Sequence, residues 1–214
     1  TQLLEWLEKY TFPIESTFGN TTYSREVADF FLEECLRNGI TTSCVYATVH
    51  PESVDAFFEA SIARGLRMAC GKVLMDRNAP EALTDTEQSG YDQTKALIEK
   101  WHGVGRNVYA ISPRFALTST PAQLEVAGAL WREHPGTLMQ THLSENPKEI
   151  NWVAELFPDA PDYFGVYETF GLSGPGAIFG HAIYLTKRER TAIRDSGSAI
   201  AHCPTSNTFI GSGL

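Results

Sequence analysis

The stretch LMQTHLSE, residues 138–145, joins an apolar run to a histidine and, three residues later, a carboxylate. We predict a buried strand over residues 137–142 that ends on His142 and places Glu145 on the next turn, within reach of the same small volume. A helix then begins near Asn146, because Pro147 is tolerated in a first helical turn. A histidine and a carboxyl group at one strand end can act as metal ligand and general acid or base. The same pair also occurs in ordinary hydrogen-bonded loops, so the neighbouring elements must decide its role.

Strands and helices alternate on both sides of this stretch. Runs rich in β-branched, aromatic and other apolar residues predict strands over residues 40–49, 66–75, 107–111, 137–142, 177–184 and 198–203. Apolar residues at helical spacing predict helices over residues 21–38, 51–64, 84–101, 121–134, 146–157, 162–170 and 187–196. Residues 1–20 are predicted to form a short helix and then an irregular segment broken at Pro13 and Gly19. Six alternations of this kind predict a parallel sheet with helical crossovers.

Two architectures contain such a sheet, the doubly wound sheet and the (β/α)8 barrel. No Gly-x-Gly-x-x-Gly follows the first predicted strand, which weakens the dinucleotide-binding, doubly wound alternative. In a barrel the chemistry lies at the carboxyl ends of the strands. Polar side chains gather at these positions: His50, Asp76, Arg114, His142, Glu145, His181, His202 and Asn207. We therefore predict an α/β fold, an incomplete (β/α)8 TIM-type barrel with about six of the eight βα units.

An incomplete barrel has consequences for the chain as a whole. Residues 1–214 are expected to form a single catalytic barrel domain that is a fragment of a longer fold. A barrel that lacks two strands has open edges with unpaired backbone N–H and C=O groups. We therefore expect these edges to be covered by a further copy of the chain, in a homodimer, or by residues outside this sequence.

Composition and charge exclude several classes of protein. The net charge is −9 and the pI is about 5.1, without a basic stripe, which argues against a nucleic-acid partner. No apolar run approaches the length of a membrane span. The N-terminal sequence TQLLEWLEKY carries acidic residues where a signal peptide needs basic ones. We expect a cytoplasmic protein without a membrane partner.

The four cysteines form no metal-binding or redox pattern. They are widely spaced and lie in or beside apolar runs, so we predict reduced thiols in the core: Cys35, Cys44, Cys70 and Cys203. The absence of a C-x-x-C pair excludes the nucleobase deaminases that hold zinc with H-x-E and P-C-x-x-C motifs.

Several motifs resemble a known family. THLSE at 141–145, GHAIYL at 180–185 and AHCPTSN at 201–207 resemble the amidohydrolase superfamily. Within it the chain resembles the guanine deaminases, through LLEWLEKYTFPIE, NGITTSCVYATVHPESVD, GKVLMDRNAP and ISPRFALTST. The resemblance covers essentially the whole chain. It implies a (β/α)8 barrel with one zinc or iron ion that hydrolyses guanine to xanthine and ammonia.

The resemblance assigns a role to each matching residue. His142 and His181 correspond to the family's single-histidine metal ligands on consecutive strands, and His142 also contributes to the substrate site. Glu145 corresponds to the proton-shuttling glutamate. Arg114 and Phe115 correspond to the residues that hold the purine, the arginine on its oxygen and the ring against the base. The alternatives are that Arg114 is an ordinary surface or salt-bridged arginine and Phe115 a core residue; the substrate-binding roles are favoured over both.

The chain also departs from the family pattern. The family's His-x-His metal pair would lie before Thr1 and its metal-binding aspartate after Leu214, so two of five metal ligands are present, and the flanking small β domain is absent. We therefore expect residues 1–214 alone to be inactive. Two alternatives to a guanine deaminase remain: an aminohydrolase of this family acting on adenine, cytosine or a triazine, and a non-catalytic, truncated barrel segment.

The remaining histidines have no partner pattern. His50, His102 and His134 are predicted at loops or helix ends, and His202 has no metal role in the family pattern. We expect AHCPTSN, which contains His202 and Asn207, to support the site rather than to bind the metal.

Overall fold

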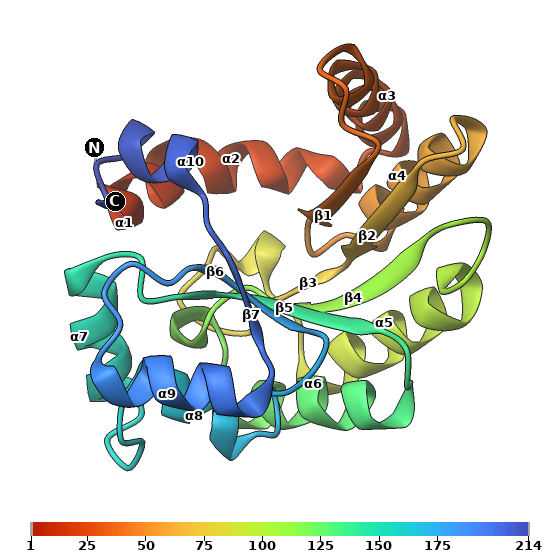
Figure 1. Cartoon of the computed structure of the whole chain (residues 1–214). Coiled ribbons are helices and arrows are strands. Elements are labelled where there is room, and N and C mark those ends of the chain that lie inside the picture. The colour runs from red at the N-terminus through yellow and green to blue at the C-terminus, as the bar shows by residue number, and fades with distance from the viewer. Residues whose placement is uncertain (1, 214) are drawn as a thin grey trace.

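The computed structural model describes residues 2–213, and its strands form one parallel sheet (Figure 1). Within these residues there are seven strands: β1 (Thr42–Tyr46), β2 (Arg67–Gly71), β3 (Val73–Leu74), β4 (Val108–Pro113), β5 (Leu138–Leu143), β6 (Ala177–His181) and β7 (Ala199–Ala201). The spatial order is β1-β2-β4-β5-β6-β7, with β3 also paired to β4, and every pairing is parallel. The order follows the chain without the reversal of a doubly wound sheet. The predicted incomplete (β/α)8 barrel is therefore confirmed.

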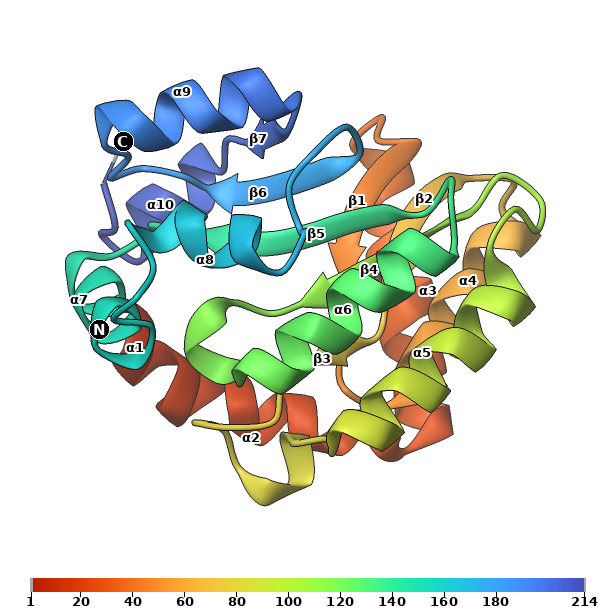
Figure 2. The ribbon, with the colours of Figure 1, turned by 90° about the horizontal axis from the view of Figure 1, so that it is seen from below.

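Helices connect the strands and cover the sheet. They are α1 (Leu3–Trp6), α2 (Phe12–Glu15), α3 (Thr21–Arg37), α4 (Pro51–Ala63), α5 (Glu87–Trp101), α6 (Pro121–Glu133), α7 (Pro147–Leu156), α8 (Tyr163–Thr169), α9 (Lys187–Ser196) and α10 (Pro204–Phe209). Seen from below, α6 and α8 lie across the strands on the outer face of the sheet (Figure 2). Large apolar side chains from the helices and from the strands are fully buried in the core between helices and sheet, such as Phe58 of α4, Tyr109 of β4 and Phe179 of β6. None of the helices in residues 2–213 combines the length and the apolar character needed to cross a membrane.

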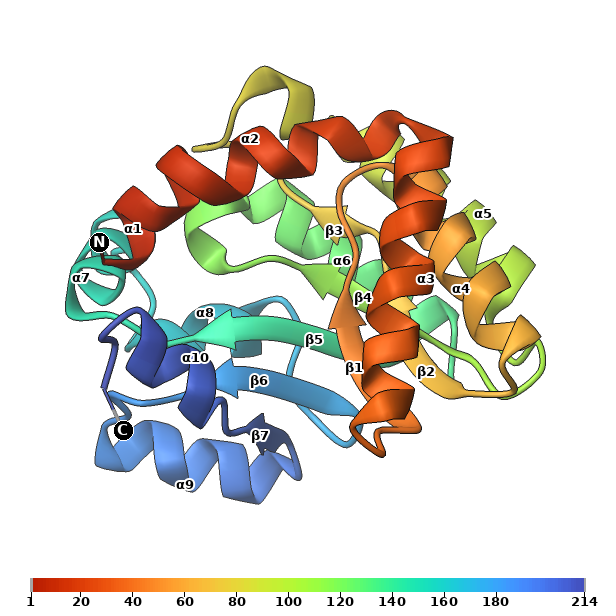
Figure 3. The same ribbon diagram turned by 90° about the horizontal axis from the view of Figure 1, so that it is seen from above.

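The N-terminal segment differs from the prediction. We expected an irregular stretch broken at Pro13, whereas α1, a π-helical turn (Leu7–Thr11), α2 and a 3-10 turn (Ser16–Gly19) follow one another without a gap. Pro13 lies in the first turn of α2, directly after the π-helical turn. The wider π turn accommodates the missing N–H and the ring of a proline that would disrupt a regular helix. The resulting rod lies above the sheet, on the face opposite α6, α8 and α9 (Figures 1 and 3).

The second strand is also interrupted. A single strand was predicted over residues 66–75, but the pairing with β4 stops after Cys70 and resumes at Val73, and β2 itself ends at Gly71. A side chain at Gly71 would place its Cβ 1.8 Å from the carbonyl oxygen of Ala110, so only glycine fits there. Lys72 is fully buried, donates its backbone N–H to the Tyr109 hydroxyl and pairs with Asp85. A glycine followed by a charged side chain inside an apolar run is the local sign of this break.

The cysteines are all free, as predicted, but only two of them are in the core. Cys35 and Cys70 are buried, whereas Cys44 is exposed and Cys203 is partly exposed. Cys44 lies on β1, which pairs on one side only among the described residues, and its thiol contacts Gln140 at 3.0 Å. Cys203 lies outside the sheet, between β7 and α10, where it is the N-cap residue of that helix. The prediction of four core thiols was therefore wrong for Cys44, on an edge strand, and for Cys203, in a connection at the surface.

Candidate active site

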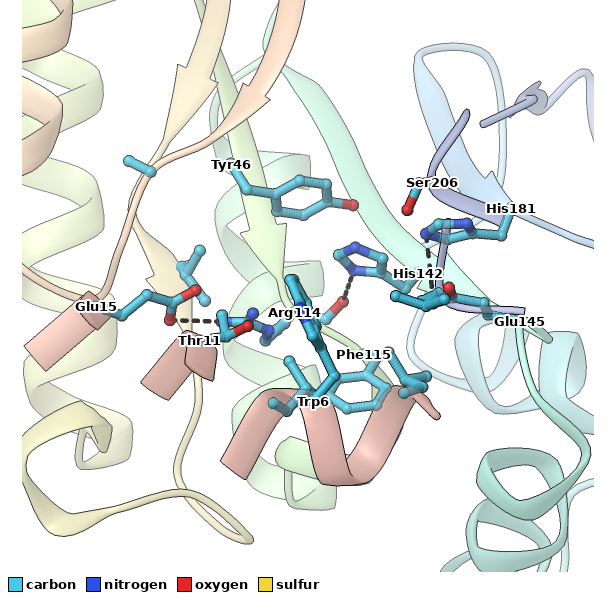
Figure 4. Close-up of a pocket in the computed structure, with 15 residues that line it drawn as sticks. Trp6, Thr11, Glu15, Tyr46, Arg114, Phe115, His142, Glu145, His181 and Ser206 are labelled. Atoms are coloured by element: carbon cyan, nitrogen blue, oxygen red, sulfur yellow. Dashed lines mark hydrogen bonds and ion pairs between the residues drawn. The ribbon is translucent and has the colours of Figure 1, made fainter. Parts of the chain in front are cut away.

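A cavity of about 230 Å³ opens at the carboxyl ends of β4, β5 and β6 (Figure 4). Its lining includes all five residues proposed from the motifs: Arg114, Phe115, His142, Glu145 and His181. The N-terminal rod forms another wall, through residues such as Trp6 and Thr11. The strand ends therefore bring together side chains that lie far apart in the sequence, in a space suited to a small molecule.

His142 lies near the end of β5 in a fixed orientation. Its Nδ1 is 2.7 Å from the carbonyl oxygen of Arg114, which can only accept, so Nδ1 carries the proton and Nε2 keeps its lone pair. The ring stacks on Tyr46 on one side and on His181 on the other, with centroids 4.5 Å and 5.4 Å away. Burial and the neighbouring His181 lower the pKa of His142 to about 3. The imidazole is therefore neutral at physiological pH, as a metal ligand must be.

His181 ends β6, the strand next to His142 in the sheet. Its Nδ1 is 2.7 Å from Oδ1 of Asn207, and its Nε2 is 3.4 Å from Oε2 of Glu145. The backbone turns sharply here, because His181 and Ala182 have φ angles of +66° and +51°. Non-glycine residues adopt this left-handed conformation at an energetic cost, and such residues cluster at functional sites. The expected supporting role of the AHCPTSN motif is confirmed for Asn207, which holds the ring through Nδ1.

The two imidazoles fit part of a metal site. Each one donates Nδ1–H to a carbonyl oxygen and leaves Nε2 available, which is the usual arrangement of a metal-ligating histidine. Within residues 2–213 no group of three or more His, Cys, Asp or Glu side chains could hold a metal ion together. The described residues therefore offer two nitrogen atoms that could ligate a metal, fewer than the three protein ligands of a catalytic zinc site.

Glu145 lies on the turn after β5 and is 2% exposed. Its Oε1 accepts a hydrogen bond of 3.0 Å from the hydroxyl of Ser212, and its Oε2 faces His181. Burial raises the pKa of this carboxyl group, and the neighbouring His181 and the Ser212 hydrogen bond oppose that shift. A buried carboxyl group with a raised pKa is suited to accept and release a proton near neutral pH.

A second buried carboxyl group, Glu149, supports the turn that carries Glu145. Its Oε2 accepts the backbone N–H groups of Glu145 and Asn146 at 3.0 Å each, and its Oε1 accepts the Tyr163 hydroxyl at 2.7 Å. Tyr163 stacks on Tyr167, whose hydroxyl donates to the carbonyl oxygen of His142 at 2.8 Å. The turn and the end of β5 are thus held by one buried network.

Glu149 should make the stability of the protein depend on pH. The side chain is fully buried, and burial raises its pKa from 4.5 to about 7. The folded state therefore keeps a proton that the unfolded state loses, so the stabilisation is complete below pH 4.5 and is lost as the pH rises through about 7. The full effect is about 3 kcal/mol. Glu149→Gln should remove this pH-dependent part of the free energy of unfolding, as measured by urea unfolding of the wild type and the variant across this pH range. An unchanged slope in the variant would contradict the assignment.

Arg114 and Phe115 form the wall opposite Glu145. The Arg114 guanidinium is 2.7 Å from the carboxylate of Glu15 on α2 and lies over the ring of Phe12. The Arg114 and Glu15 side chains are 11% and 15% exposed, so the ion pair is largely shielded from solvent. Phe115 is buried and meets the ring of His142 edge to face. Arg114 is therefore salt-bridged and lines the cavity at the same time.

The cavity also contains residues that the sequence reasoning missed, while other predicted positions lie away from it. Glu15 lay in a segment expected to be irregular, and Tyr46 had no pattern beyond an aromatic in a strand. As predicted, His50, His102 and His134 lie at helix ends: the first is the N-cap residue of α4, and the other two are the C-cap residues of α5 and α6. Four of the eight predicted strand-end residues are not among the cavity residues: His50, Asp76, His202 and Asn207, the last of which instead holds His181. Asp76 instead accepts the backbone N–H of Thr120 at 2.8 Å.

Comparison with known proteins is consistent with this geometry. The model of the amidohydrolase family matches residues 1–214. Guanine deaminase of Escherichia coli K12 is 51% identical to this chain over 213 residues, which are 100% of this chain and 48% of that protein. A solved structure of E. coli guanine deaminase superposes with a TM-score of 0.99 and is matched over 100% of this chain and 50% of that one. The structure of guanine deaminase from C. acetobutylicum with bound guanine is 33% identical, with a TM-score of 0.95, and is matched over 100% of this chain and 51% of that one. The chain thus spans about half the length of these relatives. The chain belongs to the amidohydrolase family.

Proposed function

We propose that residues 1–214 form the core of the catalytic barrel of a cytoplasmic guanine deaminase, which hydrolyses guanine to xanthine and ammonia. The observation that carries the proposal is the convergence of two imidazoles, a buried carboxyl group and an arginine on one small cavity. Similarity to guanine deaminases over the whole length of the chain supports the choice of substrate.

His142 and His181 would hold one zinc or iron ion through Nε2, together with ligands that residues 2–213 do not provide. When bound there, such a metal would supply an activated water as nucleophile at neutral pH. Glu145 takes a proton from the attacking water and delivers it to the purine ring nitrogen. The second proton of that water then passes through Glu145 to the amine, the bond between the amine and the ring carbon breaks as the carbonyl group of xanthine forms, and ammonia leaves.

Arg114 and Phe115 would orient the base. The guanidinium has five N–H donors in a rigid fork, and the ion pair with Glu15 uses only part of them. The remaining donors can bind the 6-oxygen of guanine, while Phe115 packs against the ring. Adenine carries an amino group at this position and would leave the arginine facing another donor, so the site should select 6-oxo purines.

Ammonia release tests the proposal. The natural full-length protein, loaded with zinc or iron, should release ammonia from guanine far faster than from adenine, cytosine or a triazine, whereas residues 1–214 alone should be inactive. Elemental analysis should find one metal ion per full-length chain, and sedimentation should find a homodimer. A metal-loaded protein that deaminates one of the other heterocycles but not guanine would refute the substrate assignment.

A further inference from the structure

Glu145 is held by a residue from the far end of the described chain. The hydroxyl of Ser212 donates to Oε1 of Glu145 at 3.0 Å, across 67 residues of sequence. Ser212 is 1% exposed and Glu145 is 2% exposed, so water does not compete for this contact. The hydrogen bond occupies one carboxylate oxygen and leaves the other directed toward His181.

Ser212 is itself fixed by three features of the turn that follows α10. Its backbone N–H donates to the carbonyl oxygen of Asn207 at 2.8 Å, and its own carbonyl oxygen accepts the Tyr184 hydroxyl at 2.6 Å. Gly211 and Gly213 flank it with φ angles of +69° and +130°, which other residues rarely adopt. Because Asn207 of α10 also holds His181, one short segment, α10 and the turn after it, positions both the imidazole and the carboxyl group.

We propose that Ser212 is a positioning residue that orients the Glu145 carboxyl group for proton transfer; this inference rests on the proposed deaminase function. The terminal torsion of a glutamate side chain is broad, so its two oxygens readily exchange places. Proton transfer needs one oxygen in a fixed direction, and loss of that direction lowers the rate even when the group remains present. Among the described residues, Ser212 provides the side-chain hydroxyl that fixes the other oxygen.

The test is a double-substitution cycle in the metal-loaded, natural full-length protein. Ser212→Ala should lower the kcat for guanine by about 10- to 100-fold, the effect expected on losing a hydrogen bond to a charged group. KM, metal content and melting temperature should stay close to those of the wild type. In a Glu145→Gln background the same Ser212→Ala change should have little further effect on the residual rate, because the hydroxyl acts only through the carboxyl group.

Two further variants guard against a general loss of structure. Thr208→Ala removes another hydroxyl of the same segment, one that is bonded only to carbonyl oxygens within α10, and should leave kcat unchanged. Tyr184→Phe removes the bond that anchors the Ser212 carbonyl and should lower kcat by less than Ser212→Ala does, also without loss of metal. It keeps the inference testable if Ser212→Ala does not fold.

Three results would overturn the inference. The first is a Ser212→Ala protein with wild-type kcat, and the second is an equal loss of rate in the wild-type and Glu145→Gln backgrounds, which would indicate a general structural role. The third, where Ser212→Ala does not fold, is a Tyr184→Phe protein with wild-type kcat. A wild-type protein that releases no ammonia from guanine would instead refute the proposed function, and this inference with it.

Discussion

Glu145→Gln is expected to lower the turnover of guanine by about 10²-fold or more, the usual contribution of a positioned general acid or base. Glutamine keeps the shape of the side chain and can still accept the Ser212 hydrogen bond at its amide oxygen. It cannot accept or release a proton at neutral pH. Metal content and guanine binding should survive, because His142, His181 and Arg114 are unchanged. Steady-state kinetics, elemental analysis and equilibrium binding of guanine on the full-length protein measure these three properties.

His142→Ala provides the matched control for this result. It removes a proposed metal ligand, so metal and activity should be lost together, in contrast to Glu145→Gln. If the Glu145→Gln protein holds its metal and deaminates guanine at a near-normal rate, the Glu145 carboxyl group has only a structural role in the turn before α7. The proton-transfer role assigned to it would then be wrong.

Lys72→Met is expected to destabilise the folded protein by about 3–5 kcal/mol, the range measured when one partner of a buried ion pair is removed. The Lys72 side chain is fully buried and its partner Asp85 is 8% exposed. Burial lowers the pKa of Lys72 and raises that of Asp85, and the pairing between them opposes both shifts. Methionine fills similar space but leaves the Asp85 carboxylate without its counter-charge. Urea unfolding monitored by circular dichroism gives the change in the free energy of unfolding.

An exposed pair in the same chain offers a matched control. Lys100 pairs with Asp55 at 2.9 Å, and their side chains are 51% and 32% exposed. Lys100→Met should change the free energy of unfolding by no more than about 1 kcal/mol, because solvent screens such pairs. Adding Asp85→Asn to Lys72→Met should recover part of the lost stability by removing the unpaired charge. If Lys72→Met and Lys100→Met cost the same, the buried pair is not a stabilising link between the β2–β3 break and the loop before α5.

The sequence alone determined the alternation of strands and helices and the positions of the main polar side chains. These features follow from local periodicity, because residues on a strand or helix reveal their buried face within a few positions. His142 and His181 could be paired in advance, because they end consecutive predicted strands and parallel neighbours meet at one edge of the sheet. The observed register places His142 opposite Gly180 and Leu143 opposite His181.

The tertiary structure decided which partners hold those side chains. Glu15 and Arg114 are 99 residues apart, and Ser212 and Glu145 are 67 residues apart. Lys72 meets Asp85 only because the strand breaks beside Gly71 and the loop before α5 folds back on it. Nothing in the local pattern of either partner specifies the other, since such contacts depend on how whole elements pack. Five residues of the cavity could therefore be named from the sequence, whereas the contacts that orient them depend on packing between distant segments.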